Sequence, residues 1–192
     1  LEKLLRPARG LSPAEKEKYI HDFICQGVRY DKLKKSYSHE IIGPLQNGVG
    51  VCEGIAKTVK LMCGRLGLEC VIAICEAAPG SSYLHAWNVL RLDGKHYHLD
   101  ATFDATLSRG GEIRYDYYNL CDKAIFRDHR ALLWPVPECA DGDGAYYKLS
   151  RQSLTKTEDA VSRAMQALRK KRPGFLFQWR GGYLTREKLA EL

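Results

Sequence analysis

The segment "GVGVCEGIAKTVKLMCGRLG", residues 48–67, places a cysteine directly after a glycine-containing stretch and directly before a predicted helix. Apolar side chains recur through it at helical spacing: Ile55, Val59, Met62, Cys63 and Leu66. A helix that begins at Cys52 presents unpaired N–H groups and a positive dipole end beside the sulfur. Both favour the thiolate, and the N–H groups can bind an oxyanion. From this segment alone, a nucleophile and a cysteine that merely fits a helix start are equally supported.

A predicted β-hairpin supplies chemical partners for Cys52. Residues 84–92 and 95–102 have the pattern of two strands joined by Asp93-Gly94, a strong signal for a two-residue turn. That register places six residues on one face of the sheet: His85, Trp87, Val89, His96, His98 and Asp100. His85 and Asp100 become diagonal neighbours, about 7–8 Å apart at the backbone and within side-chain reach. A carboxylate that holds an imidazole is what a cysteine–histidine nucleophilic pair requires, although a one-residue slip in register would separate them.

Helical and strand patterns flank these two segments. Ser12-Pro13-Ala14-Glu15 has the residue order of a capped helix start, and residues 69–75 form an apolar run typical of a buried strand. Residues 30–50 are polar and glycine-containing, which indicates an irregular loop that leads to Cys52. Because helices come first and strands then follow one another, we expect an α+β fold with an antiparallel sheet.

The second half of the sequence is less regular. After Asp104 the chain is expected to be rich in loops, until a capped helix opens at Thr155 and a short strand follows it. The sequence predicts that residues 1–192 form a single domain. Its core is expected at about residues 12–139, with residues 150–192 appended as a basic helix plus a short strand.

Composition and charge exclude several protein classes. A hydrophobic content of 45% with 28% charged residues is ordinary for a globular protein, and no apolar run is long enough to cross a bilayer. The net charge of +7 favours acidic partners weakly. The basic run at residues 169–172 is interpreted as the solvated end of a helix, and no nucleic acid is expected as a partner. The seven cysteines contain no CxxC pair, so a zinc ribbon is not supported.

Several stretches together resemble the core of the bacterial transglutaminase-like (transglutaminase/protease) superfamily. The main ones are "NGVGVCEGIAKTVKLMCGRLGLECVIAI" and "HAWNVLRLDGKHYHLDATFD". The upstream "HDFICQGVRYD" and "IIGPLQNGVGVCEG" and the downstream "RYDYYNLCDKAIFRDHR" also fit, so the resemblance covers about residues 19–139. It implies a papain-like/transglutaminase-like core in which a nucleophile helix packs on an antiparallel sheet. It also implies Cys52 as nucleophile, His85 as base and Asp100 as the carboxylate that orients His85.

Three further residues are candidates for the site. Gln46 lies six residues before the cysteine, the offset of the oxyanion-hole glutamine in papain-like cysteine proteases, although an ordinary loop residue is the favoured interpretation. Trp87 and Tyr83 are candidates for a substrate groove. Trp87 is also expected to shield the histidine–aspartate pair and to pack on the nucleophile helix.

His96 and His98 have a spacing that can bind a metal ion. A polar strip along the strand is the favoured interpretation, so we expect no metal and no cofactor.

The predicted function is that of a thiol-dependent hydrolase, a peptidase or amidase. It would act on a protein or peptide substrate through a Cys52–His85–Asp100 triad and a thioester intermediate. Hydrolysis is favoured over acyl transfer because a chain of this length leaves little to roof a tunnel that excludes water. The alternatives are a protein-cross-linking transglutaminase and a non-catalytic interaction domain on the same fold. The sequence does not indicate an oligomeric state, and a secreted or cell-envelope bacterial location is compatible with a signal or anchor region outside it.

Overall fold

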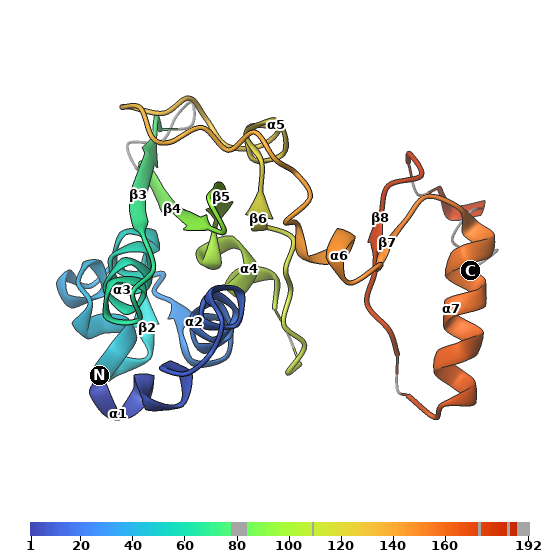
Figure 1. Cartoon of the computed structure of the whole chain (residues 1–192), viewed down its shortest axis with the longest axis horizontal. Coiled ribbons are helices and arrows are strands. Elements are labelled where there is room, and N and C mark those ends of the chain that lie inside the picture. Colours follow the sequence, from blue (N-terminus) through green and yellow to red (C-terminus); the bar gives the residue numbers. More distant parts are fainter. Residues whose placement is uncertain (78–83, 109, 173, 184, 188–192) are drawn as a thin grey trace. The chain divides into compact units, whose positions relative to one another are not determined.

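The computed structural model describes residues 1–77, 84–108, 110–172, 174–183 and 185–187 (Figure 1). The chain divides into two compact units, residues 1–144 and residues 145–192. The first unit holds all the residues that the sequence singles out for chemistry. The assignment of residues 1–192 to one domain stays a prediction. None of the described helices is long and apolar enough to span a membrane.

A four-stranded antiparallel sheet forms the centre of the first unit. Its strands follow the order β3 (Cys70–Cys75), β4 (His85–Leu92), β5 (Lys95–Leu99) and β6 (Tyr118–Leu120). Asp93 and Gly94 both have positive φ, at 48° and 83°, as a tight two-residue hairpin turn requires. Leu92 pairs with Lys95 and Val89 pairs with His98. The predicted hairpin register and the α+β class are therefore confirmed.

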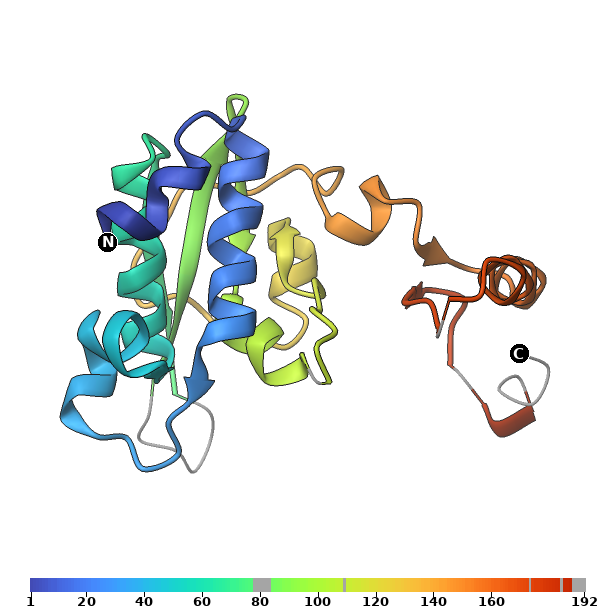
Figure 2. The same cartoon turned by 90° about the horizontal axis from the view of Figure 1, so that it is seen from below.

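The two faces of the sheet are covered by different parts of the chain. Helix α3 (Cys52–Arg65) lies along β3 and β4, and α2 (Pro13–Gly27) lies beside α3 (Figures 1 and 2). Asn88 Nδ2 donates to the α3 carbonyl of Ala56 at 3.0 Å, so the even-numbered positions of β4 face this layer. The opposite face packs against α5 (Asp122–Ile125) and the segment after it, in a core cluster of six buried residues: Ala73, Cys75, Trp87, Val89, Ile125 and Cys139.

Helix α2 begins as the sequence predicts. Ser12 is its N-cap, Pro13 occupies the first turn, and the Ser12 and Glu15 side chains form a reciprocal capping box. The helix ends at Gly27, and its Ile20 and Ile24 side chains are fully buried. Before it stand two short elements, α1 (Glu2–Leu5) and the 3₁₀-helix η1 (Arg6–Ala8).

The strand predicted for residues 95–102 is too long, and the prediction is wrong at its end. It stops at Leu99, and α4 (Ala101–Leu107) follows immediately. Asp100 causes the change because its side chain accepts hydrogen bonds from the backbone N–H groups of Thr102 and Phe103, at 2.9 and 3.0 Å. That is the behaviour of a helix N-cap.

The region predicted as an irregular loop before Cys52 contains short regular elements. These are β1 (Arg29–Tyr30), η2 (Ser36–His39), η3 (Gly43–Asn47) and β2 (Val49–Gly50). Strands β1 and β2 pair in parallel, with Arg29 opposite Val49 and Tyr30 opposite Gly50. This pairing fixes the chain immediately before the cysteine.

The second unit contains α6 (Tyr146–Leu149), β7 (Ser153–Leu154), α7 (Thr157–Arg169) and β8 (Gln178–Trp179). Strands β7 and β8 form a two-stranded parallel sheet. The predicted cap at Thr155 is wrong, because α7 has Lys156 as its N-cap and no side chain caps it.

Candidate active site

Cys52 is the first residue of α3 and is partly exposed. The chain enters the helix through Val51 in an extended conformation, and the Val51 N–H donates to the Ser38 carbonyl at 3.0 Å. The Cys52 sulfur lies 3.8 Å from the carbonyl oxygen of Leu84, the residue before β4. The start of α3 therefore meets the start of β4, where His85 stands.

The protein environment lowers the pKa of the Cys52 thiol. Burial by itself raises that pKa, but the hydrogen bond and the charge of His85 outweigh it. The backbone N–H groups of Ala86 and Glu53 lower the thiol pKa further by hydrogen bonding to the sulfur. Placement at a helix start and contact with an imidazolium are two arrangements that make a cysteine nucleophilic.

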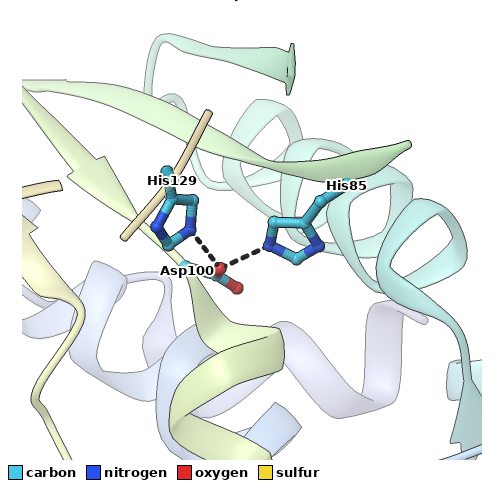
Figure 3. Close-up of side chains that lie close together, drawn as sticks. All are labelled: His85, Asp100 and His129. Carbon is cyan, nitrogen blue, oxygen red and sulfur yellow. Dashed lines mark hydrogen bonds and ion pairs between the residues drawn. The ribbon is translucent and has the colours of Figure 1, made fainter. Parts of the chain in front are cut away.

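His85 lies between Cys52 and Asp100. Its Nε2 is 2.6 Å from Asp100 Oδ2 (Figure 3), which leaves Nδ1 for the sulfur. Burial alone would lower the pKa of His85, but the charge and hydrogen bond of Asp100, together with Cys52, raise it to about 10. The lowered thiol pKa and the raised imidazole pKa favour a thiolate–imidazolium pair at neutral pH. The structure thus brings together the three residues that the sequence predicts as a triad.

Asp100 is completely buried, and donors surround both of its oxygens. Oδ1 accepts the two backbone N–H groups at the start of α4, and Oδ2 faces ring nitrogens of His85 and His129 at 2.6 and 2.9 Å (Figure 3). Burial raises the pKa of this carboxyl, but the histidine charges and hydrogen bonds overcome that effect and hold it at about 2. Asp100 is therefore an anion across the whole physiological pH range.

Sequence reasoning missed His129. It contacts Asp100 across a separation of 29 residues, and its side chain is fully buried. It belongs to the stretch "RYDYYNLCDKAIFRDHR", which contributes to the family resemblance, but no periodicity or turn pattern in that stretch marks it. Its place depends on how the segment after α5 packs on the sheet.

A pocket of about 330 Å³ adjoins the Cys52 sulfur. Most of its wall is apolar, and Glu53 at its edge pairs with His39 at 2.9 Å and with Lys57 at 2.8 Å. The lining residues are Tyr30, Lys34, His39, Val51, Cys52, Glu53, Ile74, Leu84 and Ala86. Gln46 is exposed in η3 and is not among them, so its predicted oxyanion role finds no support in the pocket.

Comparison with known proteins identifies the family. A family model of the transglutaminase-like superfamily matches residues 4–101, which include Cys52, His85 and Asp100. The chain belongs to this superfamily. No curated protein sequence matches it.

Part of the chain is also similar to solved structures, two of which are named here. One is a TGase, with a TM-score of 0.44 and 17% sequence identity over 52% of this chain and 30% of that one. The other is a candidate cysteine protease from Cytophaga hutchinsonii, with a TM-score of 0.45 and 18% identity over 53% and 36%. The chain therefore spans only about a third of the length of these two structures.

In this transglutaminase-like chain, Trp87 is a core residue and does not line the pocket. Its side chain is 1% exposed, and its ring stacks on His85 with the centroids 5.8 Å apart. It thus covers the histidine, as predicted. The expectation that it packs on the nucleophile helix is wrong, because odd-numbered positions of β4 face α5. Tyr83, the other groove candidate, lies outside the described residues.

The hydrogen bonds of His98 argue against a metal ion there. His98 Nε2 is 2.8 Å from Asp122 Oδ1, and Cys139 lies close enough to complete a possible ligand group. However, the Trp87 indole N–H donates to His98 Nδ1 at 2.9 Å, so the ring proton is on Nε2. A metal-bound histidine normally donates from its second nitrogen, which this ring cannot do.

We expect Cys52 to be the only fast-reacting thiol of the protein at pH 6. Its pKa is lowered, whereas burial and neighbouring groups raise the thiol pKa of Cys139 to about 12, and Cys70 and burial raise that of Cys63. Brief treatment with iodoacetamide followed by peptide mapping measures the labelling of each cysteine. Cys52→Ser is the control and should lack the fast phase. Preferential labelling of another cysteine in the folded protein would contradict the assignment.

Proposed function

We propose that this protein is a thiol-dependent hydrolase of peptide or carboxamide bonds, with Cys52 as nucleophile, His85 as acid and base and Asp100 as its orienting partner. The observation that carries the proposal is the position of the His85 ring. One nitrogen faces a buried carboxylate, the other is left for a thiol at a helix start, and the two pKa values shift in opposite directions. A histidine that only stabilises the fold has no need of the thiol.

The proposed reaction has two stages. The Cys52 thiolate attacks the carbonyl carbon, and N–H groups at the start of α3 stabilise the oxyanion that forms. The His85 imidazolium then gives its proton to the leaving amine as the carbon–nitrogen bond breaks, which leaves a thioester. A water molecule gives a proton to His85 and attacks the thioester. The carboxylic acid product departs and the thiolate is restored.

Two features of the pocket support a peptide substrate with an apolar side chain next to the scissile carbonyl. Tyr30, Val51, Ile74 and Leu84 supply most of the apolar wall beside the sulfur. Burying an apolar side chain there gives binding energy without any need for a paired charge. The partial exposure of Cys52 supports hydrolysis, because acyl transfer needs a site that keeps water from the thioester.

This function is tested by incubating the protein with a library of glutamine-containing peptides, with and without a large excess of a primary amine. The products are identified by mass spectrometry. We expect hydrolysed products to outnumber amine adducts, with apolar residues enriched near the cleaved bond. Cys52→Ala is the control and should give neither product. A majority of amine adducts would favour a transglutaminase. Complete lack of turnover despite rapid alkylation of Cys52 would favour a non-catalytic interaction domain.

A further inference from the structure

His129 fills the last acceptor position on Asp100. An ionised carboxylate has about four lone-pair positions for donors. Asp100 receives backbone N–H groups from Thr102 and Phe103, the Nε2 of His85, and the Nε2 of His129. Asp100 and the His129 side chain are both fully buried, so their hydrogen-bond partners must be protein groups rather than water.

The His129 ring has a hydrogen-bond partner at its second nitrogen and aromatic neighbours. Its Nδ1 is 2.8 Å from Asp128 Oδ1, and the Tyr117 hydroxyl donates to Asp128 Oδ2 at 2.5 Å. Trp87 and Phe103 pack on the ring, each with its centroid 4.8 Å from that of His129. This packing aims Nε2 at Asp100, as Figure 3 shows. With its proton on Nε2, the ring donates to Asp100.

We propose that His129 is a positioning residue that keeps Asp100 ionised by donating the fourth hydrogen bond to its carboxylate. The orientation of Asp100 does not require this bond, because the backbone N–H groups at the start of α4 already fix Oδ1. What His129 adds is a donor to Oδ2 of a carboxylate that is completely buried. This role rests on the proposed function, since its purpose is to maintain the anion that holds His85 against Cys52.

Other titratable groups near this cluster are already engaged. Asp128 and Tyr117 bond to each other, and His98 on β5 bonds to Asp122. Asp104 on α4 is paired with His21 at 3.0 Å. These side chains therefore already have partners and do not replace the donor that Asp100 Oδ2 would lose. A buried carboxylate that loses a donor binds a proton more readily, and a protonated Asp100 no longer stabilises the imidazolium.

Two amide substitutions at position 129 separate its two hydrogen bonds. Glutamine carries its amide nitrogen near the position of Nε2 and so retains a donor for Asp100. Asparagine carries its amide nitrogen near the position of Nδ1 and retains only the Asp128 side. His98→Gln is the matched control, because the His98 side chain is as buried as that of His129 and is bonded to Asp122 rather than to Asp100.

The first measurement is the rate of Cys52 alkylation by iodoacetamide as a function of pH. In His129→Asn we expect the acid midpoint of this profile to rise by about one pH unit, because Asp100 then binds a proton more readily and, once protonated, no longer stabilises the thiolate–imidazolium pair. His129→Gln should stay within about 0.3 pH units of the wild type, and so should His98→Gln. Circular dichroism establishes that each variant is folded.

The second measurement is hydrolysis of a cleaved peptide. His129→Asn should lower kcat by about 10- to 100-fold with KM within about twofold, the scale of one lost charge-assisted hydrogen bond. The proposal is wrong if His129→Asn keeps the wild-type alkylation profile, if folded His129→Gln behaves like His129→Asn, or if His98→Gln shifts the profile equally. Because alkylation needs no substrate, it tests the role of His129 even if the wild type hydrolyses no peptide. Absence of hydrolysis in the wild type would count against the proposed reaction alone.

Discussion

Replacing Asp100 by asparagine is expected to lower turnover by up to about 10⁴-fold. The backbone N–H groups of Thr102 and Phe103 require an oxygen at the Oδ1 position, so the new amide must present its NH₂ group to the two histidines. His85 Nε2 would then have to accept a hydrogen bond, and the ring proton would move to Nδ1, the nitrogen left for the thiol. A ring in that tautomer cannot take the thiol proton. Steady-state kcat and Cys52 alkylation at pH 6 should both fall.

Asp104→Asn provides the matched control for this variant. Asp104 is a second fully buried aspartate at the same helix, with Oδ2 3.0 Å from the His21 ring and Oδ1 accepting the Tyr117 N–H. Asp104→Asn should lower the free energy of unfolding by about 1–3 kcal/mol, but Asp104 makes no hydrogen bond to His85. We expect turnover close to that of the wild type. If the two variants lost turnover equally, general destabilisation would be the cause, rather than the loss of the Asp100 contact with His85.

The parts of the site that depend on local sequence could be predicted. Two positive-φ residues, Asp93 and Gly94, fix the hairpin register, and that register places His85 within reach of Asp100. The helix that begins at Cys52 follows from its own apolar spacing. Each of these features is decided within about twenty residues, so the sequence alone carries the information.

Features decided by competition or by distant contacts could not be predicted. Asp100 fits both the period of a strand and the N-cap of a helix, and its two backbone hydrogen bonds decide for the helix. The sequence correctly places Trp87 on the face of β4 that carries His85, but which layer covers that face depends on how α5 packs. His129 reaches the site through the same packing, 29 residues from its partner Asp100.

The glycine two residues after Cys52 is expected to be essential for the position of the nucleophile helix. A Cβ added at Gly54 would lie 2.2 Å from the Ser38 carbonyl oxygen and 3.2 Å from that of Glu40, and both are backbone atoms. The same Ser38 carbonyl accepts the N–H of Val51, the residue before Cys52. Close approach of α3 to η2 therefore sets where the helix starts, and only glycine permits it.

Gly54→Ala should lower the free energy of unfolding by about 1–3 kcal/mol or more, because backbone must move to admit the methyl group. Gly64→Ala is its matched control in the same helix. A Cβ there meets nothing within 4 Å, so alanine should raise stability by about 0.5–1 kcal/mol through its better helix propensity. Urea unfolding measures both changes. Since displacement of Ser38 also displaces Val51, only Gly54→Ala should slow the alkylation of Cys52. Effects of the same sign on stability would show that helix propensity, rather than the contact with Ser38, governs both positions.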